Sequence, residues 1–348
     1  MKTILQNNIW SISSFLENKK YKFNKKDILT HLPEKFIEEA IQVISSWKSY
    51  SPTPLIKLNK LDKELKLNNI YYKDEDKRFD LKSFKALGGA FAVYKIASEK
   101  KDITVSTATA GNHGRSVAWG AQRLGLECKI FISENVSESR AAAMRDLGAD
   151  VIRVKGNYDN SLKECIEQSN KNKWEIVQDV SWEGYKEVPK MIMAGYTIMI
   201  KEIFDEIDSN SITHVFLQAG VGGMAAAMIA GFAKLSKNIP KFVIIEPENA
   251  DCVFKSIQNN KPTSIDIKKE TVMGGMSCGD VSSIAWEILK NSTNYCMTIP
   301  DNAISTAVAL LAESRFSDEK IIGGECAVPG LIALIGSFNN KEYLDKLE

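Results

Sequence analysis

A lysine with an unusual setting stands in residues 83–89, which read Ser-Phe-Lys-Ala-Leu-Gly-Gly. An amine placed among apolar groups can act as a nucleophile and form an imine with a carbonyl compound. Any single lysine is more often a solvated surface residue, so Lys85 gains meaning only from its neighbours in the sequence and from other segments that could serve the same ligand.

A glycine-rich turn lies in residues 218–224, Gln-Ala-Gly-Val-Gly-Gly-Met, between an apolar strand and a helix. Backbone N–H groups at such a helix start can bind a phosphate, and glycines let the backbone approach it closely. The spacing fits neither a dinucleotide fingerprint nor a P-loop. The alternative is a tight turn that packs the helix on a sheet. The candidate phosphate-binding residues are Gly220, Val221, Gly222, Gly223 and Met224.

A polar turn in residues 107–114, Thr-Ala-Thr-Ala-Gly-Asn-His-Gly, supplies further candidates. Asn112 could donate to a ligand oxygen such as a phenolate, or could simply cap the following helix. His113 has no acidic or cysteine cluster beside it and is interpreted as structural. Asp179 follows a strand and could act as a general acid or base, or be an ordinary turn residue. Together, the lysine, the polar turn and the phosphate loop suit pyridoxal phosphate (PLP).

Alternating strands and helices must position these segments. Continuous apolar strands that alternate with helices indicate an α/β fold with parallel sheets, whose ligands lie beyond the carboxyl ends of the strands. The polar turn and the glycine-rich turn both follow such strands. Among the helices, one is expected to end before Gly125 and one long helix is expected over about residues 191–207. Strands are expected at residues 70–73, 104–106, 128–132, 151–154, 175–177, 214–217 and 242–245.

The composition excludes several classes of function. The 348 residues suffice for two domains, and 45 Lys and Arg against 44 Asp and Glu leave a net charge of +1, without the basic footprint of a nucleic-acid binder. No apolar run has the length of a signal peptide or a membrane span, so we expect a cytoplasmic protein that acts on a small molecule. Six cysteines without a Cys-x-x-Cys pair and only three histidines argue against a metal site.

Taken together, these segments resemble the tryptophan-synthase-β superfamily of fold type II PLP-dependent enzymes and, within it, the diaminopropionate ammonia-lyases. The resemblance implies two parallel-sheet domains with PLP in the cleft between them, and a homodimer. Residues 1–92 and 191–348 would form the large domain, and residues 93–190 a small inserted domain. The resemblance runs from about residue 51 to residue 330 and is most specific in residues 50–55, 73–79, 83–89, 177–185, 246–252 and 275–279.

The resemblance also implies a role for each candidate residue. Lys85 would bond covalently to PLP, Phe84 would pack beside the ring, and Asn112 would bond the 3′ oxygen. Gly220 through Met224 would hold the phosphate. Cys326 stands where relatives carry a serine and would face the pyridine nitrogen, although residues 327–330, Ala-Val-Pro-Gly, depart from the usual Gly-Ala. A neutral thiol leaves that nitrogen largely unprotonated, which suits β-elimination.

The expected reaction is α,β-elimination of ammonia from 2,3-diaminopropionate to give pyruvate and ammonia, with Lys85 and Asp179 as catalytic residues. Ala110 stands where these enzymes usually carry an aspartate associated with the D-isomer, so we expect a preference for the L-isomer. A small residue at this position also resembles serine and threonine ammonia-lyases, which are the alternative. A β-substituting enzyme, or a PLP-binding relative with little turnover, also stays open.

Overall fold

The computed structural model describes residue 5 and residues 8–109 and 111–347. Contacts within the chain divide it into two compact units. Unit 1 consists of Met1–His31, Pro52–Asp76 and Met199–Glu348, and unit 2 consists of Leu32–Ser51 and Lys77–Ile198. Unit 2 therefore contains the whole of the expected small domain and also Lys85, which the sequence-based division had placed in the large domain. The reason is that the helix of Lys85 packs on helices of unit 2.

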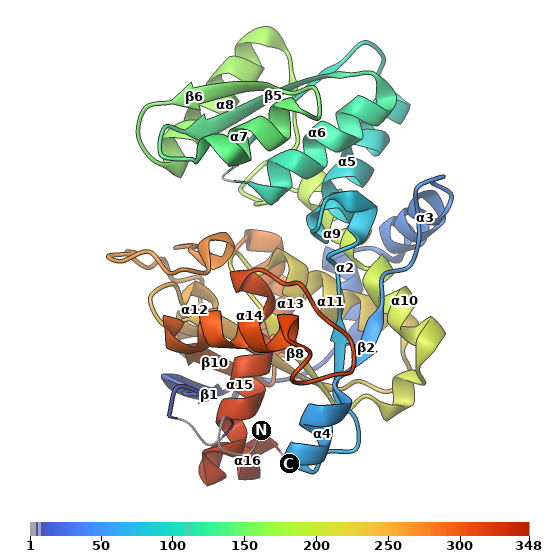
Figure 1. Ribbon diagram of the computed structural model, residues 1–348. Coiled ribbons are helices and arrows are strands. Elements are labelled where there is room, and N and C mark those ends of the chain that lie inside the picture. The colour runs from blue at the N-terminus through green and yellow to red at the C-terminus, as the bar shows by residue number, and fades with distance from the viewer. Residues whose placement is uncertain (1–4, 6–7, 110, 348) are drawn as a thin grey trace. The chain divides into compact units, whose positions relative to one another are not determined.

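The sheet of unit 2 has four parallel strands in the order β6-β5-β4-β7, of which β5 and β6 are labelled in Figure 1. Its strands are β4 (Thr104–Ala108), β5 (Glu127–Ser133), β6 (Asp150–Val154) and β7 (Glu175–Ile176). Most residues of β4 and β5 are buried, as expected for strands covered on both faces. The parallel arrangement brings the carboxyl ends of β4 and β7 to the same edge of the sheet, and the segments of Asn112 and Asp179 start there.

Helices cover both faces of this sheet. The crossovers α6 (Asn112–Leu124) and α7 (Glu138–Arg145) run in one direction along the sheet, and α8 (Tyr158–Asn172) returns in the other. Because such crossovers are right-handed, α6 and α7 lie on one face and α8 on the opposite one. α6 ends where the sequence predicted, because Gly125 adopts a left-handed C-cap conformation at φ 66°. The remaining helices of unit 2 are α3 (Glu34–Ser45), α5 (Lys85–Glu99), α9 (Glu187–Tyr196) and the short η1 (Arg78–Asp80).

The main sheet of unit 1 has the order β1-β10-β9-β8. β8 (His214–Gln218), β9 (Lys241–Pro247) and β10 (Tyr295–Ile299) are parallel, whereas β1 (Ser14–Glu17) pairs antiparallel with β10. The expected parallel sheet is thus present with one additional antiparallel edge strand, which the polar N-terminal segment did not reveal because it carries no apolar run. A separate antiparallel pair is formed by β2 (Leu55–Lys57) and β3 (Tyr71–Lys73).

The helices of unit 1 surround its core, and α11 is buried along almost its whole length. Apolar residues of the sheet, α14 and α15 form one large cluster, which includes Ile245, Leu311 and Ile332. The helices are α2 (Lys25–His31), α4 (Asn59–Leu65), α10 (Ile198–Glu206), α11 (Gly223–Leu235), α12 (Cys252–Asn259), α13 (Ser283–Ser292), α14 (Ile304–Ala312), α15 (Pro329–Phe338) and α16 (Lys341–Leu347), with short turns at η2 (Ser209–Ser211), η3 (Gly274–Met276), η4 (Asp301–Ala303) and η5 (Glu325–Ala327).

The single long helix expected over residues 191–207 is wrong. The structure has two helices there, α9 and α10, which are separated at Thr197. The Thr197 hydroxyl donates to the carbonyl of Ala194 at 2.6 Å, a local bond that competes with the helical pattern. Apolar residues continue on both sides of the break, so the sequence periodicity does not reveal it. The break lies next to the boundary between the two units at residues 198 and 199.

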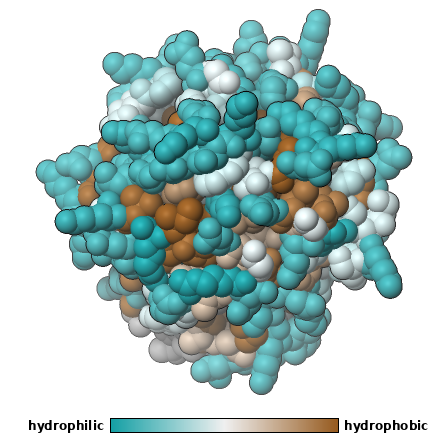
Figure 2. All heavy atoms as spheres, turned by 90° about the horizontal axis from the view of Figure 1, so that it is seen from above, coloured by the Kyte–Doolittle hydropathy of each residue, from teal (hydrophilic) through white to brown (hydrophobic). Residues whose placement is uncertain are grey.

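Polar and charged side chains cover most of the face shown in Figure 2, and apolar residues form small separate patches on it. Within the part of the chain that the structure describes, no helix combines the length and the apolar character needed to cross a membrane.

Candidate functional site

Lys85 is the first residue of α5, and its amine lies beside an acid and two aromatic rings. Its Nζ donates to Oδ2 of Asp179 at 2.5 Å. The same nitrogen lies 5.7 Å from the ring centroid of Phe84 and 5.8 Å from that of Tyr196. The side chains of Lys85 and Asp179 are only 27% and 15% exposed, so little solvent surrounds this contact. A half-buried amine with a carboxylate partner can exchange a proton or attack a carbonyl carbon.

Two glycines after Lys85 let α5 pack closely against its neighbours. A Cβ atom on Gly88 would lie 2.5 Å from the carbonyl oxygen of Ile192 and from the Tyr196 ring, both on α9. A Cβ atom on Gly89 would lie 1.7 Å from the hydroxyl oxygen of Ser116 on α6. Any larger residue must push the helices apart, so this pair of glycines determines where the start of α5, and with it Lys85, lies.

His113 and Asp179 form the electrostatic surroundings of the lysine. The carbonyl of Val177 can only accept, so His113 donates to it from Nε2 at 2.8 Å. Burial lowers the pKa of His113, and its Nδ1, 3.7 Å from Oδ2 of Asp179, has no hydrogen-bond partner among the described residues. Burial would raise the pKa of Asp179, but His113 and Lys85 together outweigh it and hold that pKa below its usual value. Asp179 is therefore ionised at neutral pH.

Tyr196 is a residue of this site that the sequence reasoning missed. Its ring packs edge-on against Phe84, with centroids 5.0 Å apart and an interplanar angle of 77°. Burial raises the pKa of Tyr196 against the opposing effect of the nearby Lys85 amine, so its hydroxyl stays protonated, and within the described chain that hydroxyl donates to no acceptor. Tyr196 approaches Lys85 only through the packing of α9 on α5, so no local sequence signal identifies it.

Gln178 is a second residue that the sequence did not single out. Its side-chain oxygen accepts from the Thr107 hydroxyl at 2.8 Å and from the N–H of Ala108 at 3.1 Å. Its amide nitrogen donates to the Ala108 carbonyl at 3.0 Å. These bonds continue the pairing of β7 with β4 beyond the last strand residue and fix the chain immediately before Asp179.

The polar turn before α6 is capped by a residue other than the expected one. The Thr109 hydroxyl oxygen accepts from the N–H groups of Gly111 at 3.0 Å and Gly114 at 3.2 Å. Asn112 is exposed at the first position of α6, so its alternative role as a helix cap is not the one that the structure shows. Ala110 lies outside the described residues.

In unit 1, the glycine-rich turn connects β8 to the N-terminus of α11, and Met224 is the second residue of that helix. A Cβ atom on Gly220 would lie 3.0 Å from the sulfur of Cys278 and 3.1 Å from the carbonyl oxygen of Gly275. Gly222 has a φ of +86°, and a Cβ atom there would lie 2.8 Å from Leu289. The turn therefore needs glycine at both positions, and it leads directly into a helix start of the kind that binds phosphate.

Cys326 belongs to the same region of unit 1. It lies in η5, and a Cβ atom on Gly275 would lie 3.3 Å from its sulfur. Gly275 is thus in contact with both Gly220 and Cys326. The predicted residues consequently form two groups: Gly220 to Met224 with Cys326 in unit 1, and Phe84, Lys85, Asn112 and Asp179 in unit 2.

These groups have the chemistry that a phosphorylated aldehyde requires. The half-buried amine of Lys85 suits the carbonyl carbon, and the crowded glycines at a helix start suit the phosphate. The buried Nδ1 of His113 and hydroxyl of Tyr196 still have hydrogen-bonding capacity for a ligand. Across the described ranges, no group of three or more His, Cys, Asp or Glu residues is arranged to hold a metal ion.

Comparison with known proteins gives one family. Residues 47–345 match the model of the pyridoxal-phosphate dependent enzymes. The chain is 34% identical over 303 residues to diaminopropionate ammonia-lyase of Escherichia coli, covering 81% of this chain and 76% of that protein. The crystal structure of that E. coli enzyme in complex with an aminoacrylate–PLP azomethine reaction intermediate matches 98% of this chain and 91% of its own, with a TM-score of 0.89 and 31% identity. A biosynthetic L-threonine dehydratase of Haemophilus influenzae is 28% identical over 213 residues, 61% of this chain and 39% of that protein.

Proposed function

This chain belongs to the pyridoxal-phosphate dependent enzymes and is an ammonia-lyase that uses PLP, and from that premise we propose that its substrate is 2,3-diaminopropionate. The reaction consumes one water and releases pyruvate and two molecules of ammonia. The observation that carries the proposal is the 34% identity to diaminopropionate ammonia-lyase of E. coli over 81% of the chain. The fold is that of fold type II PLP enzymes, with two α/β units.

The two groups of residues divide the work of holding the cofactor. Lys85 would bond to its aldehyde carbon, with Phe84 beside the ring and Asn112 on its 3′ oxygen. Gly220 to Met224 would bind its phosphate, and Cys326 would face its pyridine nitrogen. The half-buried amine and the crowded glycines support these assignments. When bound, PLP withdraws electrons from the Cα of the amino acid and so weakens its C–H bond.

Asp179 and Lys85 would handle protons as a pair. Because the pKa of Asp179 is lowered, this carboxylate is a poor proton donor at neutral pH. Its role is to accept the hydrogen bond of the Lys85 amine and to stabilise the charge that Lys85 acquires when it takes the Cα proton. The Tyr196 hydroxyl, protonated and buried close to Phe84, is available as a donor in the same place.

The identity of residue 110 leads us to propose a preference for the L-isomer. The resemblance to diaminopropionate ammonia-lyases implies an aspartate at that position, where this chain carries alanine. A base reaches the Cα proton of only one isomer, because the two isomers present that proton on opposite faces. With Lys85 as the base and no carboxylate at residue 110, one face lacks a proton acceptor.

The experiment is a panel assay of the purified holoenzyme with L- and D-diaminopropionate, L-serine and L-threonine. We expect pyruvate from L-diaminopropionate at the highest kcat/KM and much slower turnover of the D-isomer. The Ala110→Asp variant should raise turnover of the D-isomer by roughly tenfold or more, with a smaller effect on the L-isomer. Equal use of both isomers by the unmodified enzyme would contradict the proposed preference.

The same panel tests the alternative function. A serine or threonine ammonia-lyase expels hydroxide instead of ammonia, and the similarity to L-threonine dehydratase favours that reading as the second candidate. It predicts 2-ketobutyrate from L-threonine at a higher kcat/KM than pyruvate from L-diaminopropionate. We also propose a cytoplasmic homodimer, which light scattering on the eluting protein and cell fractionation would test.

A further inference from the structure

A cavity of about 430 Å³ lies in unit 2 and involves none of the residues assigned to the cofactor. This volume falls in the range of small-molecule sites. The wall combines serines, one acid, two cations and two aromatic rings, drawn from the segment after α3, the segment before Lys85, and α6. The lining residues are Ser49, Ser51, Lys77, Phe79, Asp80, Trp119 and Arg123.

The guanidinium of Arg123, an exposed side chain, lies close to two aromatic rings of this region. Its guanidinium carbon lies 4.2 Å from the ring centroid of Trp47 and 4.7 Å from that of Trp119. Trp119 in turn stacks on Phe79, with centroids 4.5 Å apart and an interplanar angle of 26°. Aromatic rings attract a guanidinium through the ring face, and the N–H groups of the guanidinium that do not contact a ring stay available to a carboxylate. An arginine that already contacts rings in this way has less freedom to lose when an oxyanion binds.

The three charged side chains of the wall, Lys77, Asp80 and Arg123, are exposed, so they are open to a ligand from solution. Among the described residues, Arg123 and Lys77 form no ion pair, and the carboxylate of Asp80 accepts no hydrogen bond there. Two positive charges and one negative charge line the cavity. A ligand with two carboxylates and one ammonium has the complementary set, whereas a phosphate alone leaves Asp80 facing an anion.

The backbone beside the cavity is strained. Phe79, Asp80 and Lys82 have φ values of 52°, 59° and 54°, a left-handed conformation that favours glycine. All three precede Lys85 by six residues or fewer, so this segment connects the cavity wall to the start of α5. Strained backbone of this kind is common at ligand sites and in segments that switch conformation.

We propose that this cavity binds a dicarboxylic amino acid, and that its occupancy is coupled to Lys85 through residues 79–85. Arg123 and Lys77 bind the carboxylates, and Asp80 binds the ammonium. A ligand that favours one conformation of the strained segment shifts the position of the lysine at its end. The coupling rests on the proposed role of Lys85 as cofactor lysine, whereas the binding site does not.

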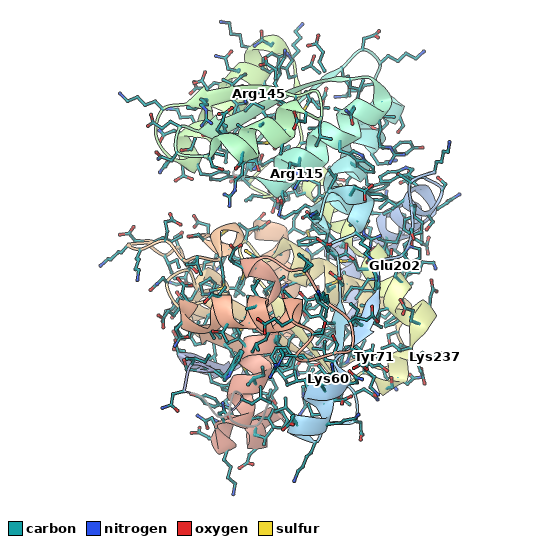
Figure 3. All side chains as sticks on the ribbon, viewed as in Figure 1. Lys60, Tyr71, Arg115, Arg145, Glu202 and Lys237 are labelled. Atoms are coloured by element: carbon teal, nitrogen blue, oxygen red, sulfur yellow. The ribbon has the colours of Figure 1, made fainter. Side chains whose placement is uncertain are left out.

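The test is calorimetric titration of the holoenzyme with L-glutamate, glutarate and inorganic phosphate. We expect one saturable glutamate site per chain. Replacement by glutamine at Arg123 or Lys77 should raise the Kd by roughly tenfold or more, because each loses a charge-assisted contact. Arg145→Gln is the control, since Arg145, which is labelled in Figure 3, is an arginine of the same unit and already pairs with Glu138. Circular dichroism checks the fold of both variants. If the Arg123 variant misfolds, the Lys77 variant still tests the site, because Lys77 is an exposed side chain.

A second comparison isolates the ammonium. The Asp80→Asn variant keeps a residue that tolerates the left-handed conformation and loses only the charge. It should weaken glutamate binding and leave glutarate binding unchanged. Phosphate binding as tight as that of glutamate would overturn the assignment of an amino acid. Glutamate binding that survives Arg123→Gln but disappears in Lys85→Ala would place the ligand at the cofactor and overturn the site.

The coupling has its own readout. Saturating glutamate should change the visible absorption of the bound cofactor, and this change should be absent in Arg123→Gln. Binding without any spectral change would overturn the coupling and leave the site standing. A visible band that persists in Lys85→Ala would instead refute the role of Lys85, which is a failure of the proposed function and not of the cavity.

Discussion

Unit 2 gathers ionisable groups around its reactive residue, whereas unit 1 surrounds its glycine turn with neutral ones. In unit 2, Asp179 lies 2.5 Å from the amine of Lys85 and 3.7 Å from the ring of His113. In unit 1, a Cβ atom on Gly220 would lie closest to a thiol and a carbonyl oxygen. The first arrangement depends on protonation and the second on shape, so the two should respond differently to substitution and to pH.

A buried acid near the glycine turn supports this contrast. Cys252 lies 3.6 Å from the Gly220 carbonyl and 3.7 Å from Oε1 of Glu246. The carboxyl of Glu246 accepts from the N–H groups of Val253 and Phe254 at the start of α12. Burial nevertheless raises the pKa of Glu246 to about 8, so this acid is largely protonated and neutral at pH 7.

The largest expected effect is that of Lys85→Ala. Loss of the amine should abolish the visible absorption of the holoenzyme and lower kcat for ammonia release by roughly 10³-fold or more. Lys95→Ala is the matched control on the same helix, because Lys95 pairs with Glu39 at 2.6 Å away from this contact. Absorption spectra and steady-state assays measure both variants. A Lys85→Ala protein that keeps its visible absorption band would show that the cofactor is not bonded to Lys85.

Gly222→Val should weaken cofactor binding without abolishing the fold. Its φ of +86° strains any L-residue, at a cost of about 1–2 kcal/mol, and Leu289 blocks the added side chain. Gly148→Val is the control, because Gly148 has a φ of +84° and no atom within 4 Å of an added Cβ. Melting curves should show a loss of stability in both variants, while titration with PLP should show weaker binding only at Gly222. Equal PLP affinity in the two variants would show that the shape of this turn does not matter.

Glu246→Gln should reduce the fall in the free energy of unfolding that occurs as the pH rises from 6 to 8. Its folded pKa, about 8, lies above the ordinary 4.5, so the folded state holds the proton more tightly. The stability that this group contributes is complete below pH 4.5 and is lost as pH rises toward 8, at up to about 1.4 kcal/mol per pH unit. Urea unfolding at pH 6 and pH 8 measures the slope. An unchanged slope in the variant would show that Glu246 is ionised in the fold.

His113→Gln should change the pH dependence of the free energy of unfolding at acidic pH instead of alkaline pH, and by a smaller amount than Glu246→Gln. The pKa of His113 is lowered from 6.5, so the unfolded chain binds the proton more readily than the folded one. The stability that this group contributes is present above pH 6.5 and is lost as pH falls. Glutamine can still donate to the Val177 carbonyl but does not titrate, so the acidic slope between pH 7 and pH 5 should shrink by up to about 1.4 kcal/mol per pH unit. If the free energy of unfolding has the same pH dependence in the variant and the parent, His113 does not contribute to that dependence.

The sequence predicted the helices and strands of this fold better than it predicted the contacts between residues far apart in the chain. The end of α6 at Leu124 followed from Gly125, because a left-handed C-cap is a local requirement. The break at Thr197 was missed because apolar residues on both sides are buried. Sequence motifs identified Lys85 and Asp179 separately, but their contact at 2.5 Å joins residues that are 94 positions apart. Tyr196 could not be predicted for the same reason, since its place depends on how α9 packs against α5.

The glycine pair that follows Lys85 limits which substitutions this helix can accept during evolution. Gly88 and Gly89 have no side chain that could take part in the reaction, yet a methyl group on either would collide with α9 or α6. In a library of random single substitutions selected for activity, both positions should be nearly as intolerant as Lys85, while exposed positions of the same helix accept many residues. Genetic intolerance in this helix therefore extends beyond the reacting residues to the positions where a neighbouring helix lies too close for any side chain.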